Sequence, residues 1–510
     1  SWVHGFGRMS LAIVRTRASS GLAAPAVTVE VHLSNGLPSF SIVGLPETVV
    51  RESRERVRSA LLTSGYNFPA RRITVNLAPA DLPKEGGRFD LPIALGILEA
   101  SDQIPVRCLN TLECVGELGL GGELRPIRGA LVFSRAVSQE ERTVVLPAAN
   151  VEEALLVPGA KVLSVSHLTE LTAHLSGRRV LPYTRPEPSR TFSVTGPDMA
   201  DVRGQYLGRR ALELAAAGGH HLLLVGPPGC GKTMLAQRLP GLLPLMTEDE
   251  ALESAATFAS STGGVNLDLW QNRPFRSPHH GISSVALVGG GAKALPGEVS
   301  LAHHGILFLD EFCEFDKRVL DQLREPLEQG SITISRARRT VRYPSRFQLV
   351  AAMNPCPCGY YGDPSGRCRC TPQRVTRYMD RISGPLIDRI DLQINLGPVD
   401  SAALNPKFPC GESSSTVRCR VKHARAAQHS RFAEINSRVA IDVFEKKCQL
   451  NPDAHQFLIE SMRTLQFSAR AYHRILRLAR TIADLSASDR IEPQHISESI
   501  HYRYLDRVSV

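Results

Sequence analysis

The sequence predicts an α/β protein with a parallel-sheet core, an α+β domain before it and a helical segment after it. In residues 198–406, apolar strand-like stretches such as HLLLVG, GILFLD and RFQLVAAM alternate with helical stretches. This alternation is typical of a parallel sheet with helices on its faces. Residues 10–110 mix β-rich and helical stretches, and beyond residue 416 helical periodicity dominates.

The N-terminal domain is expected to span residues 9–180. AVTVEVHLS and RRITVNLAP are rich in β-branched residues and bounded by turn formers, so both are predicted strands. ETVVRESRERVRSALLTSG has helical spacing and reaches Gly65, a suitable C-cap, and DLPIALGILEAS predicts a second helix. Residues 181–197 contain four prolines and are predicted to form a linker.

A polar stretch with Pro, Gly and Ser at residues 407–416 marks a second boundary. We therefore expect a core domain at 198–406 and a helical C-terminal domain at 407–510. Its helices are expected at about 416–436, 451–463, 468–486 and 493–503.

Charge and cysteine usage restrict the class of protein. The 510 residues carry a net charge of +10, which permits an anionic partner such as nucleic acid or a membrane surface without deciding between them. We find no apolar run long enough to cross a membrane and no secretory leader. The eleven cysteines are an odd number with uneven spacing. We therefore expect a cytoplasmic protein with reduced cysteines.

A glycine-rich loop follows HLLLV and precedes the helical stretch MLAQRLPGLL, and it matches the pattern G-x-x-x-x-G-K-[ST]. The glycines let backbone N–H groups surround phosphates, the lysine reaches the β- and γ-phosphates, and the hydroxyl ligates Mg²⁺. The loop is therefore predicted to bind ATP and Mg²⁺. Its residues are Gly226, Pro227, Pro228, Gly229, Cys230, Gly231, Lys232 and Thr233.

Later strands end in side chains that suit ATP hydrolysis. We expect Asp310 to hold the Mg²⁺ shell, Glu311 to polarise the attacking water, and Asn354 to orient that water or contact the γ-phosphate. Arg389 and Arg470 are candidates for arginines that stabilise charge on the transferring phosphoryl group. The sequence alone does not separate these two from surface arginines.

These motifs, with LIDRIDL and SARAYHRILRLARTIADL, occur in an order that resembles the magnesium-chelatase-like branch of the AAA+ ATPases. Longer strings, among them EVHLSNGLPSFSIVGLPE, RPFRSPHHGISSVALVGGG and NPCPCGYYGD, are similar to the ComM (YifB) family of bacterial competence proteins. The resemblance extends from Met9 to about Tyr504.

The resemblance implies an AAA+ core with an α-helical lid, assembled into a hexameric ring. It also implies a helicase that drives branch migration during homologous recombination in natural transformation. The implied partners are single-stranded and branched DNA and recombinase-bound intermediates, and no membrane. By the same analogy, Arg389 is the finger supplied to a neighbouring subunit, and Arg470 is the second sensor in the lid.

Residues 20–140 resemble the Lon-protease-like, ribosomal-S5-like α+β domain. Lon proteases place a nucleophilic serine in a glycine-rich turn before a helix, whereas the comparable stretch here is EGGRFDL at 85–91. Neither Arg88 nor Phe89 can act as a nucleophile. We therefore interpret the domain as a scaffold or DNA guide, and an ATP-dependent protease is disfavoured.

Four cysteines lie within residues 356–370, where glycines allow the tight turns that such a short loop needs. Four thiolates suit a tetrahedral structural Zn²⁺. The spacing is C-x-C instead of the commoner C-x₂-C, so reduced free thiols and an iron–sulfur cluster stay open as alternatives. The cysteines are Cys356, Cys358, Cys368 and Cys370.

The pairs His279–His280 and His303–His304 also attract a metal interpretation. Adjacent residues on a strand point to opposite faces, so we expect packed or hydrogen-bonded histidines.

Residues 331–342 predict a β-hairpin with a basic tip. Its arginines would follow DNA phosphates if they line a ring channel, which the family resemblance favours over an ordinary solvated hairpin. A second candidate is the segment 284–293, where glycines before Lys293 suggest a mobile loop. The hairpin arginines are Arg336, Arg338, Arg339 and Arg342.

The leading hypothesis is a ring motor that couples ATP hydrolysis to DNA translocation. The alternative is a chelatase-type remodelling ATPase that acts with partner subunits. That alternative shares the ATPase core but leaves the N-terminal domain, the cysteine cluster and the arginine hairpin unexplained.

Overall fold

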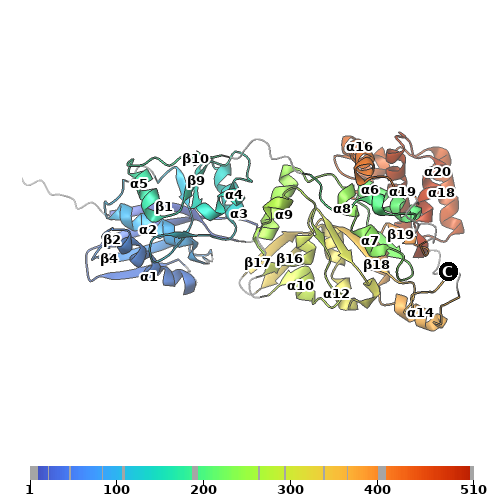
Figure 1. Cartoon of the computed structure of the whole chain (residues 1–510), viewed down its shortest axis with the longest axis horizontal. Coiled ribbons are helices and arrows are strands. Elements are labelled where there is room, and N and C mark those ends of the chain that lie inside the picture. Colours follow the sequence, from blue (N-terminus) through green and yellow to red (C-terminus); the bar gives the residue numbers. More distant parts are fainter. Residues whose placement is uncertain are drawn as a thin grey trace, which may run out of the picture. The chain divides into compact units, whose positions relative to one another are not determined.

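The computed structural model divides into two compact units (Figure 1). The first comprises Ser1–Thr191 and Leu252–Trp270, and the second comprises Phe192–Ala251 and Gln271–Val510. The residues that the structure describes are 10–20, 22–44, 48–82, 84, 86–105, 109–185, 193–261, 265–291, 294–336, 339–363, 366–399 and 409–505.

The first unit contains a four-stranded sheet in the order β1-β2-β4-β3, with α1 and α2 packed against it. β3 and β4 run parallel, and the other neighbours run antiparallel. β2 and β4 bury alternate residues, as strands with one covered face do. The two predicted strands and two predicted helices are confirmed. The bounds are β1 Ser10–Arg17, β2 Ala26–Ser34, β3 Ser39–Val43, β4 Arg72–Ala78, α1 Thr48–Thr63 and α2 Asp90–Ala100.

A second sheet in this unit, in the order β10-β9-β8-β5, is a feature that the sequence patterns did not predict. Its strands have only two to five residues, too few to show a period. β10 falls within the stretch 181–197 that was expected to be a linker, of which 186–192 lie outside the described residues. The bounds are β5 Leu112–Cys114, β6 Glu117–Leu118, β7 Leu124–Arg125, β8 Thr143–Pro147, β9 Val162–Val165, β10 Tyr183–Thr184, α3 Ala130–Gln139, α4 Val151–Ala154 and α5 Leu168–Leu175.

The second unit is built around a five-stranded sheet in the order β12-β15-β18-β11-β19, in which all neighbours run parallel. Every residue of β11, β15 and β18 is buried, as expected for strands covered on both faces. The predicted parallel sheet is therefore confirmed. The bounds are β11 Leu222–Val225, β12 Phe275–Arg276, β15 Ile306–Leu309, β18 Gln348–Met353 and β19 Leu392–Asn395.

The two edges of this sheet carry different sets of functional candidates. Residues that follow parallel strands gather at the carboxyl edge, and residues that precede them gather at the amino edge. Strands of four residues keep the edges about 13 Å apart. At the carboxyl edge, Gly226 follows β11, Asp310 follows β15 and Asn354 follows β18. At the amino edge, His221 precedes β11, and Arg389 and Asp391 precede β19.

The single helix expected from MLAQRLPGLL is wrong, because the segment forms two short helices, α7 and α8. Pro240 stands near the start of α8. It has no N–H to continue the hydrogen bonding of a helix that begins at Lys232. The helices of the core are α6 Tyr206–Gly218, α7 Lys232–Ala236, α8 Leu239–Leu242, α9 Glu248–Ala259, α10 Ser284–Val288, α11 Glu298–Leu301, α12 Lys317–Asp321, α13 Arg324–Gln329, α14 Pro372–Met379 and α15 Gly384–Ile387.

The C-terminal helices gather beside α6 and β19 (Figure 1). Helices α16 and α19 share one apolar core with the sheet, whereas α17, α18 and α20 pack with α19 in a second cluster. Val421 on α16 and Leu478 and Ile482 on α19 pack into that core. The four helices predicted here are confirmed, and the short α17 was not predicted. The bounds are α16 Ser414–Phe432, α17 Ile441–Lys447, α18 Pro452–Thr464, α19 Ala469–Leu485 and α20 Pro493–His501.

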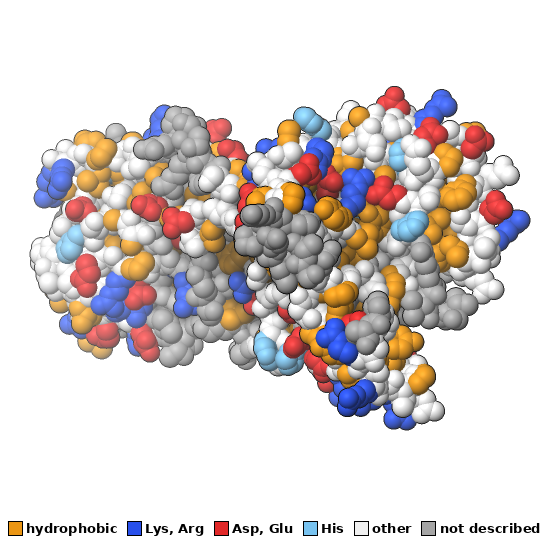
Figure 2. All heavy atoms as spheres, turned by 45° about the vertical axis from the view of Figure 1, so that its right-hand side comes forward, with side chains coloured by type: hydrophobic (Ala, Val, Ile, Leu, Met, Phe, Trp, Pro, Cys, Tyr) orange, Lys and Arg blue, Asp and Glu red, His pale blue; other side chains and the backbone are white. Residues whose placement is uncertain are grey.

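Basic and acidic side chains are intermixed on the face drawn in Figure 2, so the net charge does not gather there into one large basic surface. Among the described residues, no helix is both long and apolar enough to cross a membrane.

Candidate nucleotide site

The glycine-rich loop at 226–233 turns directly after β11, as predicted. Gly229 and Gly231 have φ values of 79° and 91°, in the left-handed region that favours glycine. A Cβ on Gly226 would lie 2.7 Å from the carbonyl oxygen of Leu396, so the loop leaves no room for a side chain there. The glycines are therefore needed for the shape of the loop.

Lys232 and Asn354 converge on this loop. The Lys232 ammonium donates hydrogen bonds to the carbonyl oxygens of Gly226 (2.8 Å) and Pro227 (3.0 Å) and to Oδ1 of Asn354 (3.1 Å). Burial lowers the pKa of Lys232. The end of β18 thus places the Asn354 amide beside the loop lysine, where both could contact a phosphate oxygen.

Two oxygen ligands suited to Mg²⁺ also meet at the carboxyl edge. The Thr233 hydroxyl donates a hydrogen bond of 2.7 Å to Oδ2 of Asp310. A hydroxyl and a carboxylate are the hard oxygen donors that Mg²⁺ prefers, and Mg²⁺ keeps further positions for water and phosphate oxygens. The pair therefore fits a magnesium ion shared with a nucleotide.

Glu311 has an unusual backbone conformation, with φ of 52°. A non-glycine residue in the left-handed region is uncommon, and such residues concentrate at functional sites. Its N–H donates to Oδ1 of Asp310 (2.9 Å), and its side chain is 60% exposed. The turn therefore directs the carboxylate outward from the edge, where a water could be reached.

His280 is a neighbour of this site that the sequence interpretation missed. Its Nδ1 lies 3.0 Å from Oε2 of Glu311. The signal that could have found it is its position shortly after β12, the strand that pairs with β15. His280 is thus placed to orient the Glu311 carboxylate.

In both histidine pairs the two rings lie against each other, so the expectation that adjacent residues point to opposite faces is wrong. His303 and His304 are buried, as predicted, whereas His279 is exposed. The ring centroids lie 4.0 Å apart in His279–His280 and 3.8 Å apart in His303–His304. Nδ1 of His303 also accepts a hydrogen bond of 3.0 Å from the backbone N–H of Arg346.

The two candidate arginines lie at the opposite edge of the sheet. Arg389 and Arg470 line one cavity of about 600 Å³. Arg389 forms an ion pair with Glu328, and Nη1 of Arg470 lies 3.5 Å from Oδ2 of Asp388. Within the described part of the chain, the lining of this cavity includes no residue of the loop 226–233. The cavity that the two arginines line is therefore separate from that loop.

The four clustered cysteines come together after β18. All four sulfur atoms lie within 4.8 Å of one another, and three of their separations are 3.3, 3.6 and 3.8 Å. Zn–S bonds of about 2.3 Å in a tetrahedron place sulfur atoms about 3.8 Å apart. Backbone N–H groups of Tyr360 and Arg369 lower the pKa of the Cys358 thiol to about 6, which favours a thiolate there. For the other two thiols, desolvation and hydrogen bonds with the neighbouring thiols outweigh a backbone hydrogen bond, so they raise the pKa of Cys368 to about 11 and also raise the pKa of Cys370. The donor set therefore fits one tetrahedral metal ion.

The cysteine loop also contacts the nucleotide loop. Gly359 has φ of 86°, and a Cβ there would lie 2.7 Å from Cδ of Pro228. The turn between the second and third cysteines therefore packs directly against the glycine-rich loop.

The predicted arginine hairpin is confirmed as the antiparallel pair β16 (Ser331–Arg336) and β17 (Arg339–Pro344). It packs on a second ribbon, β13 (Gly289–Gly290) and β14 (Leu295–Pro296). The Tyr343 hydroxyl donates to the Ala294 carbonyl (3.0 Å), and a Cβ on Gly289 would meet Ile334. The two segments considered for DNA binding are thus neighbours, which the sequence did not indicate.

The structure describes the hairpin arginines unevenly. The Arg342 side chain is exposed, and its Nε donates to Oγ of Ser331 (3.0 Å). Arg336 and Arg339 pair through their backbones, and Arg338 and Lys293 lie outside the described residues. The expectation of a loop over all of 284–293 is wrong for its first half, which is α10 capped by Ser283.

The turn that replaces the Lon-type serine is a packing element. Gly87–Phe89 form a single 3₁₀ turn before α2, with Phe89 fully buried. The Arg88 guanidinium is also buried and donates to the carbonyl of Arg128 (2.5 Å). Neither side chain is open to a substrate.

The core combines a parallel sheet with a glycine-rich loop after β11 and an acidic pair after β15. Together with the family models that match the chain, these features identify a magnesium-chelatase-type AAA+ protein. The family model "Magnesium chelatase, subunit ChlI" matches residues 198–404. "Subunit ChlI of Mg-chelatase" matches 29–150, and "Magnesium chelatase, subunit ChlI C-terminal" matches 411–503. Membership of this class supports ATPase activity with ATP and Mg²⁺.

Full-length relatives identify the family within this class. "Uncharacterized protein YifB" of Salmonella typhimurium is 48% identical over 502 residues, 98% of this chain and 99% of that protein. "Competence protein ComM" of Haemophilus influenzae is 48% identical over 504 residues, with the same two shares. The chain belongs to the ComM/YifB family. A more distant similarity, 22% over 216 residues, covers 40% of this chain and 25% of "Maternal DNA replication licensing factor mcm6" of Xenopus tropicalis.

Proposed function

We propose that this protein is a ring-forming ATPase that moves along DNA and drives branch migration of recombination intermediates during natural transformation. The main support for a ring is the position of Arg389 and Arg470, which lie across the parallel sheet from the nucleotide loop. A second copy, placed with its carboxyl edge against this amino edge, would bring Arg389 and Arg470 to its own nucleotide. Each complete site then contains residues of two subunits, and the assembly is a hexamer in our proposal.

The residues of one subunit divide the remaining work at the nucleotide. Thr233 and Asp310 would hold Mg²⁺, which neutralises charge on the β- and γ-phosphates. Lys232 binds the same phosphates, and Asn354 senses the γ-phosphate through its amide. Glu311 accepts a hydrogen bond from the attacking water and polarises it.

Two basic segments and the names of two relatives support DNA as the partner. The hairpin β16–β17 carries four arginines and no acidic residue between 331 and 342. The ribbon on which it packs leads to Lys293. The described strands of the two segments are neighbours, which supports a proposal that both contribute to one phosphate-tracking surface. The Haemophilus influenzae relative is named a competence protein, and the Xenopus tropicalis relative is named a DNA replication licensing factor.

Replacing Arg338 and Arg339 together by Ala should remove two phosphate contacts. The salt slope of DNA binding, log Kd against log salt, should fall by roughly two units, about one for each contact. Affinity should fall similarly for all DNA sequences, because phosphates carry no base information. Branch migration of a three-stranded substrate should fall more than binding, while ATPase activity without DNA stays near the unmodified rate.

Lys446 and Lys447 replaced together by Ala form the matched control. They are exposed at the end of α17 and carry the same total charge. The control should leave the salt slope and branch migration unchanged. Equal behaviour of the two double variants would contradict a DNA-tracking hairpin.

We also propose that Cys356, Cys358, Cys368 and Cys370 bind a structural Zn²⁺. The purified protein should contain about one zinc per chain by elemental analysis. Cys358→Ser should lower that content and also reduce ATP turnover, because the cysteine loop packs on Pro228. Cys419→Ser, an exposed cysteine on α16, is the control and should change neither value. Absence of any metal after gentle purification would favour free thiols, and iron with acid-labile sulfide would favour a cluster.

The second candidate is a chelatase-type remodelling ATPase, favoured by the description of the three matching family models. Stimulation of ATP hydrolysis separates the two. Branched DNA should stimulate a motor, whereas a chelatase-type ATPase should respond to porphyrin-inserting partner subunits and not to DNA.

A further inference from the structure

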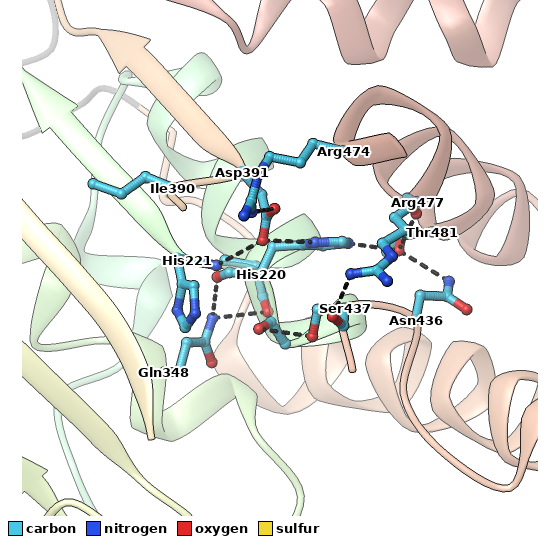
Figure 3. A network of polar contacts seen from close by, with 12 residues as sticks. His220, His221, Gln348, Ile390, Asp391, Asn436, Ser437, Arg474, Arg477 and Thr481 are labelled. Carbon is cyan, nitrogen blue, oxygen red and sulfur yellow. Dashed lines mark hydrogen bonds and ion pairs between the residues drawn. The ribbon is translucent and has the colours of Figure 1, made fainter. Parts of the chain in front are cut away.

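Helix α19 directs a row of polar side chains at the amino edge of the sheet (Figure 3). Arg470, Arg474, Arg477 and Thr481 recur at intervals of three or four residues, so they share one face of the helix. Figure 3 labels Arg474, Arg477 and Thr481. Arg470 and Arg477 have other partners. Among the described residues, Arg474 is the one of the three arginines that contacts the chain on both sides of Ile390. This helix belongs to the C-terminal lid.

Arg474 binds the turn that contains Arg389. Its Nη1 donates a hydrogen bond of 2.9 Å to the backbone carbonyl of Arg389 and forms an ion pair with the Asp391 carboxylate. One guanidinium thus holds two points of the chain that are separated by a single residue. The backbone of Arg389 is therefore tied to the lid helix.

Asp391 is itself fixed from the sheet side. Its Oδ2 lies 3.3 Å from Nδ1 of His220 and accepts from the backbone N–H of His221 (3.3 Å). Nε2 of His220 in turn contacts the Thr481 hydroxyl (2.8 Å), one further point on α19. Burial alone would raise the pKa of Asp391, but Arg474 and His220 outweigh it and hold the pKa well below its usual range. The carboxylate is therefore charged and oriented when Arg474 meets it.

We propose that Arg474 is a positioning residue that couples the lid helix α19 to Arg389. When α19 moves, Arg474 changes the position of Arg389 relative to the nucleotide of a neighbouring subunit. The proposal rests on the proposed function, because it needs Arg389 to act on a neighbour. Lid movement in one subunit would then be transmitted through Arg474 to hydrolysis in the next, without any contact between Arg474 and that nucleotide.

Arg477 is the matched comparison on the same helix face. It donates to the backbone carbonyls of Ser437 (3.0 Å) and Val439 (2.6 Å). Like Arg474 it bridges α19 to another segment, but its hydrogen bonds do not involve residues 388–391. Loss of packing alone should therefore affect Arg474→Ala and Arg477→Ala alike.

The test measures ATP turnover, nucleotide affinity and ring formation of Arg474→Ala, Arg477→Ala and Arg389→Ala, each alone and mixed with Glu311→Gln subunits. Arg474→Ala should hydrolyse ATP about 10- to 100-fold more slowly, because a displacement near 1 Å can cost that much. Its nucleotide affinity should stay unchanged. Mixing should restore activity, because Glu311→Gln subunits supply a correctly held Arg389. Arg477→Ala should keep most of its turnover.

A double variant separates positioning from folding. If Arg474 acts only through Arg389, then adding Arg474→Ala to Arg389→Ala should leave the remaining rate unchanged. A further drop, or loss of turnover together with nucleotide affinity, would overturn the positioning role. Arg474→Lys, which keeps the charge but not both contacts, should fall between the unmodified protein and Arg474→Ala.

The mixtures also distinguish the positioning role of Arg474 from the proposed site shared between subunits. Recovery of Arg389→Ala without recovery of Arg474→Ala would reject the positioning role and keep the shared site. Failure of Arg389→Ala to recover in verified mixed rings would reject the shared site itself.

Discussion

Glu311→Gln is expected to lower ATP turnover by about 10²- to 10⁴-fold while ATP binding stays near normal. The amide keeps the size of the side chain but cannot accept a proton from water. The loop contacts of Lys232, Thr233 and Asn354 do not involve Glu311, so nucleotide affinity should not depend on it. Single-turnover hydrolysis and equilibrium binding of a fluorescent nucleotide measure the two quantities separately.

Glu314→Gln is the matched control for this change. Glu314 lies three residues further on and pairs with Arg381 at 2.8 Å. The Glu314→Gln variant should therefore retain the ATP turnover of the unmodified protein. Near-normal hydrolysis by Glu311→Gln would remove Glu311 from its proposed role.

Arg389→Ala is expected to reduce turnover by about 10³-fold or more, the range found for arginines that stabilise a transferring phosphoryl group from a second protein. Rings and nucleotide binding should persist, because Arg389 lies at the amino edge, away from the loop of its own subunit. Mixing with Glu311→Gln subunits should restore part of the activity at interfaces that combine an intact Glu311 with an intact Arg389. Gel filtration and ATPase rates of titrated mixtures provide the measurement.

Arg381→Ala provides the comparison for the arginine. It removes an exposed guanidinium that pairs with Glu314 and lies in a different cavity. It should keep its turnover alone and in mixtures. If Arg389→Ala loses nucleotide affinity as well, or if no mixture recovers activity, then Arg389 serves its own subunit and the shared site is wrong.

The residues at the carboxyl edge of the core could be predicted from the sequence because each stands next to the short pattern that identifies it. The glycine-rich loop, Asp310 and Asn354 each follow a recognisable apolar strand, and parallel strands bring their ends together. The four cysteines lie within fifteen residues, so their convergence needed only a tight loop. Long periodic helices such as α19 were also predictable, because many residues contribute to the pattern.

The amino edge could not be predicted in the same way. The contacts of Asp391 with His220 and Arg474 join residues separated by 171 and 83 positions, and no period or motif records such a pairing. The same reason hid the contact between His280 and Glu311. The two-residue strands and the seven-residue α17 are too short for a pattern, and the break between α7 and α8 depends on one proline.

The opposite placement of the nucleotide loop and the arginine cavity has a consequence for symmetry. If the nucleotide site is shared between subunits as proposed, each subunit carries two unlike half-sites, and a twofold axis would bring like halves together and complete neither. Only a head-to-tail contact joins unlike halves, and such a contact repeats until it either closes on itself or continues as an open row. An open row leaves one loop and one arginine face without a partner at its ends, whereas a closed assembly leaves none. A closed ring therefore has one more complete site than an open row of the same number of subunits.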